Sequence, residues 1–512
     1  MLPKLIESLR DPACYPHAVD QVNVIETHIS WLLLTGEYAY KVKKPVNFGF
    51  LDFTTLEQRR HCCEEEVRLN QRLAPDIYIG LIPIGGSDDA PELDADEGII
   101  EYAVKMYQFD PELRLDRLLK RHLFETHWID LLAEQIAAFH QRIPIVAQDS
   151  PWGEPETIWE VVADNYRYIP PDHLDAEDWT LLQQLSTSTA ERFRALEGLM
   201  RQRKREGHVR ECHGDLHLAN INLFHDQLRL FDCIEFNLEF RWIDTISDLA
   251  FLLMDLEANQ QFRWANRCLN LYLELTGDYT ALPLLNFYKA YRSMVRAKVA
   301  MLGNQPDLPT CRHYLKLTEH YCRERSPAVF LMHGVSGSGK SYLSERLAEA
   351  VGVIRIRSDV ERKRLYRELS LQGKSLQLYG AEMNSRTFQH LLDTTAAMLN
   401  AGYSVVVDAT FIHQRTRNAY VELAANLNLP VRIISCHCEQ NLIEARLKRR
   451  QEEGKDPSDA DVQVMHEQLN VMQPLSSEEQ LITLPVDTRD DEAIEQLMAQ
   501  LRAQRLIGDW DE

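Results

Sequence analysis

The feature that most constrains the fold is the stretch Gly334–Ser341, which reads GVSGSGKS. It fits G-x-x-x-x-G-K-[ST], the pattern of a phosphate-binding P-loop. The apolar residues 328–332 before it predict a buried strand, and residues 342–351 after it predict an amphipathic helix. A loop between such elements can turn backbone N–H groups toward phosphate oxygens at the start of the helix. The stretch therefore predicts a nucleotide site in an α/β domain.

The residues of this loop have separate expected roles. Lys340 is expected to reach the terminal phosphates and to take part in catalysis, while the Ser341 hydroxyl is expected to hold Mg²⁺. ATP and Mg²⁺ are thus the expected cofactors. The remaining residues expected to bind the nucleotide are Gly334, Ser336, Gly337, Ser338, Gly339 and Tyr342.

Strands and helices alternate after the loop. Strands are predicted at 353–357, 403–410, 431–436 and 481–486, which indicates a parallel sheet with helices on both faces. Ligands collect at the carboxyl ends of such strands, and two acids lie there. Asp359 is expected to accept the proton of a substrate hydroxyl, and Asp408 to bind Mg²⁺.

A cationic segment is predicted to close on the transferred phosphoryl group. Arg446 and Arg450 share a helical face at i and i+4, so both can reach one anion as catalytic groups. The polar, Gly- and Pro-containing stretch that follows predicts a lid over about residues 446–462.

The chain ahead of residue 326 has a different pattern. A hairpin is predicted around Thr35-Gly36-Glu37, followed by a helix over 55–73, and residues 85–97 are predicted to form a loop. The pattern becomes helical from residue 111. Within a helix predicted over 286–302, three cations form a basic stripe, for which a solvated face is favoured over an anionic-substrate surface: Lys289, Arg292 and Arg296.

A second chemical motif lies in this region, at His213–Asn220 (HGDLHLAN). An Asp and an Asn five residues apart, with Asp232 twelve residues further on, form an acid layout suited to phosphoryl transfer to a hydroxyl. The stretch resembles the catalytic loop of protein kinases and, more closely, that of aminoglycoside and choline phosphotransferases. The resemblance implies that Asp215 is the base, with Asn220 and Asp232 as metal ligands.

The same resemblance implies a lysine that binds the ATP phosphates and a helix carboxylate that holds it. Lys41 in Ala39-Tyr40-Lys41 fits, with Lys43 as a rival on the same side of the strand. The expected partner is Glu65 or Glu66, with Glu65 placed in the cofactor site. Asp248 is expected to brace the catalytic loop. The chain departs from protein kinases because no G-x-G-x-x-G precedes this strand.

The P-loop region resembles kinases related to gluconate kinase, the zeta-type toxins and the kinase half of phage polynucleotide kinase. The resemblance is carried by Ser358–Lys363 and by the Asp-Ala-Thr stretch at 408–410. It implies that Arg362 and Arg415 lie on the substrate side.

The whole chain resembles a bacterial two-domain family that fuses an aminoglycoside-phosphotransferase-like domain to a P-loop kinase. This implies an α+β, bilobal, protein-kinase-like domain over 1–325, with an N-lobe of about 1–108 and a helical C-lobe of about 109–325. An α/β P-loop domain follows over 326–512, its parallel sheet covered by helices on both faces. The resemblance names no substrate.

Composition narrows the class of protein. The net charge of −22 argues against a protein that wraps long nucleic acid. No apolar run reaches membrane-spanning length, and the first residues form no signal-type core, so a cytoplasmic protein is expected. The ten cysteines fit reduced thiols, and core packing is favoured over metal binding for Cys436-His437-Cys438. The oligomeric state stays open.

The leading functional hypothesis is an ATP-dependent phosphotransferase with two ATP·Mg²⁺ sites, acting on hydroxyl groups of small-molecule or nucleotide-derived substrates. A second hypothesis makes the N-terminal domain a regulatory or ligand-sensing module, which the missing glycine-rich loop favours. A third is a toxin-like kinase that acts on nucleotide sugars or RNA ends, although the acidic charge weakens its RNA version.

Overall fold

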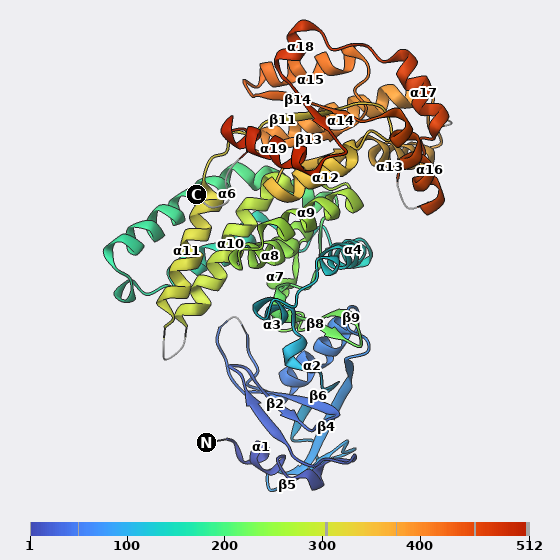
Figure 1. Cartoon of the computed structure of the whole chain (residues 1–512). Coiled ribbons are helices and arrows are strands. Elements are labelled where there is room, and N and C mark those ends of the chain that lie inside the picture. The colour runs from blue at the N-terminus through green and yellow to red at the C-terminus, as the bar shows by residue number, and fades with distance from the viewer. Residues whose placement is uncertain (1, 50, 303–305, 375, 455–456, 508–512) are drawn as a thin grey trace. The chain divides into compact units, whose positions relative to one another are not determined.

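The computed structural model (Figure 1) describes residues 2–49, 51–302, 306–374, 376–454 and 457–507. By its internal contacts the chain divides into two compact units. The N-terminal unit comprises Met1–Asp255 and Tyr291–Leu315, and the C-terminal unit comprises Leu256–Ala290 and Lys316–Glu512. Each unit is thus built from two separate stretches of the chain. The domain boundary at residues 325 and 326 stays a prediction.

The N-terminal unit contains an antiparallel sheet with the order β1-β2-β3-β6-β4-β5. The predicted hairpin is confirmed as β2 and β3, and helix α2 begins after Thr55, which forms a capping box with Gln58. The loop predicted over 85–97 is wrong in part, because β4 continues to Ser87 and pairs with β5. The bounds are β1 Asn23–Glu26, β2 Ser30–Leu34, β3 Tyr38–Lys43, α2 Leu56–Asn70, β4 Tyr78–Ser87, β5 Ala90–Leu93 and β6 Glu101–Tyr107.

The two faces of this sheet bury different side chains. Tyr40 and Val42 of β3 pack with a core that includes Ile6 of α1 (Lys4–Ser8) and Leu9, the next residue after that helix, whereas Ala39 packs with Cys63 of α2. Lys41 and Lys43 alternate with Tyr40 and Val42, so they share the face of Ala39. The strand register therefore directs both lysines toward α2.

Helices and short strands make up the rest of this unit, which includes α8 only up to Asp255, α10 only from Tyr291, and α11 (Leu308–Cys322) only up to Leu315. The bounds are α3 Leu115–Lys120, α4 His127–Arg142, α5 Pro155–Arg167, α6 Ala176–Arg205, β7 Val209–Glu211, β8 Ile221–Phe224, β9 Gln227–Leu230, α7 Leu238–Arg241, β10 Trp242–Asp244, α8 Thr245–Ala258 and α10 Leu282–Met301, and the short 3-10 turns are η1 Pro12–Cys14, η2 Pro111–Leu113, η3 Pro171–His173 and η4 Leu218–Asn220.

The basic stripe predicted to be solvated on α10 is largely buried. Arg292 is 3% exposed and donates to the carbonyl oxygen of Gly214 at 3.1 Å, while Lys289 is 7% exposed and pairs with Glu257. Arg296 donates to the Tyr314 hydroxyl. Spacing along a helix places residues on one face but does not say what covers that face.

The C-terminal unit contains a five-stranded parallel sheet with the order β12-β13-β11-β14-β15, flanked by helices. All five residues of the central strand β11 are buried, as expected for a parallel strand covered on both faces. The strand bounds are β11 Val329–His333, β12 Ile354–Arg357, β13 Val405–Asp408, β14 Val431–His437 and β15 Thr483–Asp487.

One helix of this unit comes from the middle of the chain. Helix α9 lies along α12, and its Asn270 caps the outer edge of β12 by accepting from Arg355 N at 2.7 Å and donating to Val353 O at 3.1 Å (Figure 1). The bounds are α9 Phe262–Thr276, η5 Tyr279–Ala281, α11 Leu308–Cys322, α12 Lys340–Val351, α13 Ser358–Leu371, α14 Ala381–Asn400, α15 Gln414–Asn426, α16 Gln440–Glu453, α17 Val462–Val471, α18 Ser477–Leu481 and α19 Asp491–Ala503.

A helix that crosses a membrane must be both long and apolar. Within the described residues, no helix combines the necessary length and hydropathy.

Candidate functional site

The P-loop lies between β11 and α12, as the sequence predicts. Gly337 and Gly339 have φ of 81° and 92°, a conformation that glycine adopts without strain. A Cβ on Gly337 would lie 2.8 Å from Ile443, and one on Gly339 would lie 2.8 Å from Thr488. Both glycines are thus required by backbone conformation and by close packing.

Lys340 is the first residue of α12 and is buried. Its Nζ donates to the carbonyl oxygen of Val335 at 2.7 Å, which holds the ammonium group over the loop. Burial lowers the pKa of Lys340, and the carboxylate of Asp408 opposes this shift. An anion bound beside the ammonium group would offset this burial.

Asp408 ends β13, the strand next to β11. Its Oδ2 accepts from the Ser344 hydroxyl at 3.2 Å and lies 3.7 Å from Nε of Arg357. Asp408 and Ser341 line the same cavity, so the two residues predicted to hold Mg²⁺ face one space.

This cavity has a volume of about 1500 Å³ and lies entirely within the C-terminal unit. It brings together most residues that the sequence predicts for the donor, the acceptor and the lid. Gly334 and Ser338 are not among its lining residues. Those that line it are Ser336, Gly337, Gly339, Lys340, Ser341, Tyr342, Asp359, Arg362, Asp408, Arg415, Arg446 and Arg450.

The side of the cavity that is predicted to bind the acceptor contains a buried guanidinium. Arg362 is 7% exposed, donates to Asn384 Oδ1, and lies 5.5 Å from the centre of the Tyr379 ring. Among the described residues its Nε has no hydrogen-bond partner, and burial lowers its pKa. Arg415 lines the same cavity and is exposed.

The two arginines of α16 that are predicted to be catalytic, Arg446 and Arg450, contact neutral groups. Arg446 donates to Oγ1 of Thr488 at 3.1 Å and to its carbonyl oxygen at 2.9 Å, and Arg450 donates to the carbonyl oxygen of Ala460. The predicted lid begins within α16, and its residues 455–456 lie outside the described part. Asp459, near its end, accepts from Lys363 at 2.8 Å and from the Tyr379 hydroxyl at 2.5 Å.

Sequence reasoning missed a residue of α17 at this site. Gln468 lines the cavity, and its Oε1 accepts the backbone N–H of Ser336 at 2.7 Å. Val335 packs in one apolar cluster with Leu447 of α16 and Met465 of α17. Helix α16, in which the predicted lid begins, and helix α17, in which it ends, therefore both contact the P-loop directly. No local pattern marks Gln468, because its partner is 132 residues away.

In the N-terminal unit, both candidate lysines bind the same carboxylate, and it is Glu66 and not Glu65. Lys41 Nζ lies 2.8 Å from Glu66 Oε1, and Lys43 Nζ lies 2.7 Å from Glu66 Oε2. Glu66 is buried, whereas Glu65 pairs with Arg68 and Arg241. Glu65 is the wrong partner because one residue turns a helical side chain by about 100° to another face.

Two further carboxylates join this network. Lys41 also pairs with Asp232 at 2.8 Å, and Lys43 pairs with Glu235. Burial opposes ionisation of Glu66, but Lys41 and Lys43 outweigh it and lower the pKa of Glu66 to about 2. The lysines are thus matched by carboxylates of the protein itself.

The predicted catalytic loop brings its polar residues together. Asn220 Nδ2 donates to Asp215 Oδ2 at 2.9 Å, and His217 Nε2 lies 3.3 Å from the same oxygen. Burial would raise the pKa of Asp215, but His217 outweighs this and holds the pKa well below its usual range. The backbone N–H of Phe231, beside Asp232, donates to Asn220 O at 3.0 Å. Asp215, Asn220 and Asp232 therefore lie in one connected region.

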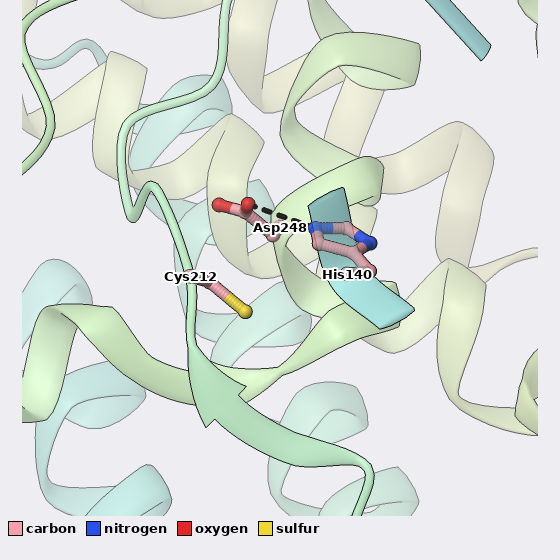
Figure 2. A group of neighbouring side chains, drawn as sticks. All are labelled: His140, Cys212 and Asp248. Atoms are coloured by element: carbon pink, nitrogen blue, oxygen red, sulfur yellow. Dashed lines mark hydrogen bonds and ion pairs between the residues drawn. The ribbon is translucent and has the colours of Figure 1, made fainter. Parts of the chain in front are cut away.

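Figure 2 shows the group behind this loop, in which Asp248 points toward His140 and lies near Cys212. Asp248 accepts from the backbone N–H groups of His213 and Gly214 at 3.1 and 2.8 Å, and lies 3.1 Å from His140 Nε2. Burial raises the pKa of the Cys212 thiol well above its usual value, so the thiol stays protonated. A protonated thiol and a carboxylate engaged with backbone groups favour a brace over a metal site.

Known proteins resemble this chain over two different lengths, one family model matching part of the C-terminal unit and relatives matching most of the chain. Residues 329–475 match the family model of the AAA domain. The matched AAA domain includes the P-loop, Asp359, Asp408, Arg446, Arg450 and Gln468. It leaves out β15 with Thr488, and also α9.

Relatives of nearly the whole chain occur in mycobacteria. The uncharacterized protein Rv2004c of Mycobacterium tuberculosis is 29% identical over 452 residues, which span 86% of this chain and 89% of the relative. The uncharacterized protein Mb2027c of Mycobacterium bovis has the same values. The similarity extends well beyond the AAA domain.

Solved structures are similar over about a third of the chain. A gluconokinase from Sinorhizobium meliloti is 21% identical, covering 35% of this chain and 99% of its own, with a TM-score of 0.26. The APS kinase CysC of Mycobacterium tuberculosis is 18% identical, covering 35% and 99%, with a TM-score of 0.25. Likeness at these values does not indicate a substrate.

Proposed function

We propose that the C-terminal unit transfers a phosphoryl group from ATP·Mg²⁺ to a hydroxyl group of a small-molecule or nucleotide-derived acceptor. One observation carries this proposal: a single cavity of about 1500 Å³ joins the P-loop, the carboxylates Asp359 and Asp408, and a set of cations. Phosphoryl transfer requires this combination, because catalysis consists largely of positioning and charge stabilisation.

On the donor side, the P-loop amides and Lys340 bind the β- and γ-phosphates. Ser341 and Asp408 hold Mg²⁺, either directly or through its bound waters. Arg446 and Arg450 approach the transferred group from α16. In the structure both arginines donate to neutral oxygens. An anion can therefore bind to them without breaking an ion pair with a described carboxylate.

On the acceptor side, Asp359 accepts the proton of the attacking hydroxyl. Arg362 favours an acceptor that carries an anionic group, because its buried guanidinium forms no ion pair with a described carboxylate. A buried charge without a counter-charge is costly, and an anionic substrate offsets that cost. Arg415 adds a second cation to this side.

The N-terminal unit supports a second candidate site for ATP·Mg²⁺. The convergence of Lys41 with Glu66 and Asp232, and of Asp215 with Asn220, favours it. In this proposal Asp215 is the base, and Asn220 and Asp232 are metal ligands. The alternative is that this unit binds ATP or a metabolite without transfer and regulates the C-terminal unit.

The test measures ATP turnover across a panel of hydroxyl-bearing acceptors, with and without anionic groups. Wild type is compared with Lys340→Ala, Asp359→Asn and Asp215→Asn. Loss of turnover of one acceptor class in the first two variants, with Asp215→Asn unaffected, supports kinase activity of the C-terminal unit. Turnover that survives Lys340→Ala and Asp359→Asn for every acceptor contradicts it.

The same panel separates the two readings of the N-terminal unit. Loss of a different acceptor class in Asp215→Asn supports two transfer sites. If Asp215→Asn changes no acceptor but Lys41→Met alters the rate of the C-terminal reaction, the N-terminal unit is regulatory.

A further inference from the structure

Strand β12 carries two arginines that meet one carboxylate of helix α9. Arg355 Nη2 donates to Glu274 Oε2 at 2.9 Å, and Arg357 Nη1 donates to Glu274 Oε1 at 3.0 Å. The two arginines are two residues apart on a strand, so both point to the same side. Glu274 therefore bridges them with its two oxygens.

The arginine nearer the end of the strand also reaches the candidate metal site. Arg357 lines the cavity, and its Nε lies 3.7 Å from Asp408 Oδ2. Strands β12 and β13 pair Arg357 directly with Asp408 in register. The guanidinium thus lies between Glu274, which holds one end of it, and the carboxylate predicted to bind Mg²⁺.

Helix α9 is fixed to this unit by contacts on either side of Glu274. Arg267 pairs with Glu345 and Glu349 of α12, and Asn270 caps the edge of β12. The carbonyl oxygen of Glu274 also accepts from Arg364 of α13. These contacts set the position of the Glu274 carboxylate relative to β12.

We propose that Glu274 positions Arg357 beside Asp408, so that helix α9 is a working part of the metal site. The inference rests on the proposed function, in which Asp408 binds Mg²⁺. Glu274 offsets the charge of Arg357 and holds its Nε at 3.7 Å from Asp408 Oδ2, which is longer than a hydrogen bond. Without the charge of Glu274, Arg357 moves onto Asp408 and competes with the metal ion.

The experiment uses the full chain and four variants: Glu274→Gln, Arg357→Gln, the double variant, and Glu349→Gln. Glu349→Gln is the matched control, because it removes an ion pair between α9 and α12 that does not involve Arg357. Two measurements are made. One is the Mg²⁺ concentration for half-maximal ATP turnover, and the other is the Kd of Mn²⁺ by calorimetry with a non-hydrolysable ATP analogue.

Glu274→Gln is expected to raise both the half-maximal Mg²⁺ concentration and the Kd of Mn²⁺ about three- to tenfold. This is the size of a single local charge effect at a partly buried site. In the Arg357→Gln background the same change is expected to shift them less than about twofold, and Glu349→Gln is expected to match wild type within about twofold. The inference is overturned if Glu274→Gln matches wild type, or if its shift is equally large in both backgrounds.

Folding and the proposed function are checked separately. Melting temperatures identify any variant that fails to fold, and Glu274→Asp, which keeps the charge on a shorter side chain, then replaces Glu274→Gln. Glu274→Asp is expected to weaken Mn²⁺ binding about two- to threefold. A Kd of Mn²⁺ equal to that of wild type would overturn the inference. If wild type turns over no ATP, or if Lys340→Ala matches it, the proposed function fails, while the calorimetric comparison still decides the role of Glu274.

Discussion

The cations of the two candidate phosphate sites differ in how their charge is compensated. In the N-terminal unit, Lys41 and Lys43 contact the carboxylates of Glu66, Asp232 and Glu235. In the C-terminal cavity, four predicted cations donate to neutral groups, and none of the four forms an ion pair with a described carboxylate: Lys340, Arg362, Arg446 and Arg450.

The sequence motifs predict a phosphate site in each unit, and this difference in charge compensation distinguishes the two. A cation held by neutral acceptors gains the full attraction of an incoming phosphate, whereas a cation in a closed network must exchange partners. The C-terminal cavity is therefore the stronger candidate for an anionic ligand. The N-terminal network contributes more to holding the sheet, α2 and the segment of Asp232 in one geometry.

The largest expected effect is on stability in the N-terminal unit. Lys43→Met leaves Glu235 buried without its cation and is expected to destabilise this unit by about 3–5 kcal/mol. Arg362→Met, in the C-terminal cavity, leaves no carboxylate unpaired and is expected to stay within about 1 kcal/mol of wild type. Urea unfolding followed by fluorescence measures both changes.

A double variant tests the cause of this first effect. Adding Glu235→Leu to Lys43→Met removes the orphaned carboxylate and is expected to recover most of the lost stability. Equal losses in Lys43→Met and Arg362→Met would mean that charge compensation does not distinguish the two sites.

The second prediction concerns turnover. In the proposed reaction Lys340 stabilises charge on the transferred group, so Lys340→Ala is expected to lower kcat by about 10²–10³-fold. Glu349→Gln, near the other end of the same helix and outside the cavity lining, serves as a control for changes in α12. Steady-state ATP turnover measures both, and a Lys340→Ala variant with more than a tenth of wild-type kcat contradicts the assignment.

The third prediction concerns binding. A non-hydrolysable ATP analogue with Mg²⁺, at 100 times its Kd, is expected to stabilise the C-terminal unit by about 2.7 kcal/mol. Lys340→Ala is expected to lose this stabilisation, and Lys41→Met to keep it. Differential scanning calorimetry measures the change in Tm; the reverse pattern would make the N-terminal unit the main nucleotide site.

The smallest expected effect is at the end of the predicted lid. Asp459→Asn weakens the contacts with Lys363 and Tyr379, which are partly exposed and worth about 1 kcal/mol or less. The expected result is a two- to fivefold rise in the acceptor KM, which corresponds to about 1 kcal/mol or less, with little change in kcat. Steady-state kinetics at saturating ATP measures both constants, and an unchanged KM would mean that the contacts do not help to close the cavity.

Elements with strong local patterns could be predicted from the sequence. The P-loop, the parallel strands and the hairpin of β2 and β3 follow from motif, apolar runs and turn residues. The cavity also contains Asp359, Asp408 and the predicted arginines, because the carboxyl ends of parallel strands meet at one edge.

Features set by distant contacts could not be predicted. Glu65 and Glu66 are adjacent acids with equal local merit, and only packing of α2 against the sheet selects Glu66. Gln468 and Glu274 gain their roles from partners far along the chain. The burial of Arg292 also depends on a distant contact, because its guanidinium donates to Gly214 of the predicted catalytic loop.

The cap that Asn270 places on β12 affects how this chain can be divided. Its amide satisfies backbone groups of an edge strand that would otherwise present open hydrogen-bonding positions. A recombinant fragment that starts at residue 326 lacks this cap, so it invites strand pairing between copies. The same holds for recombination that transfers the P-loop region alone to another protein. Strand β12 would then lack its cap unless α9 were transferred as well.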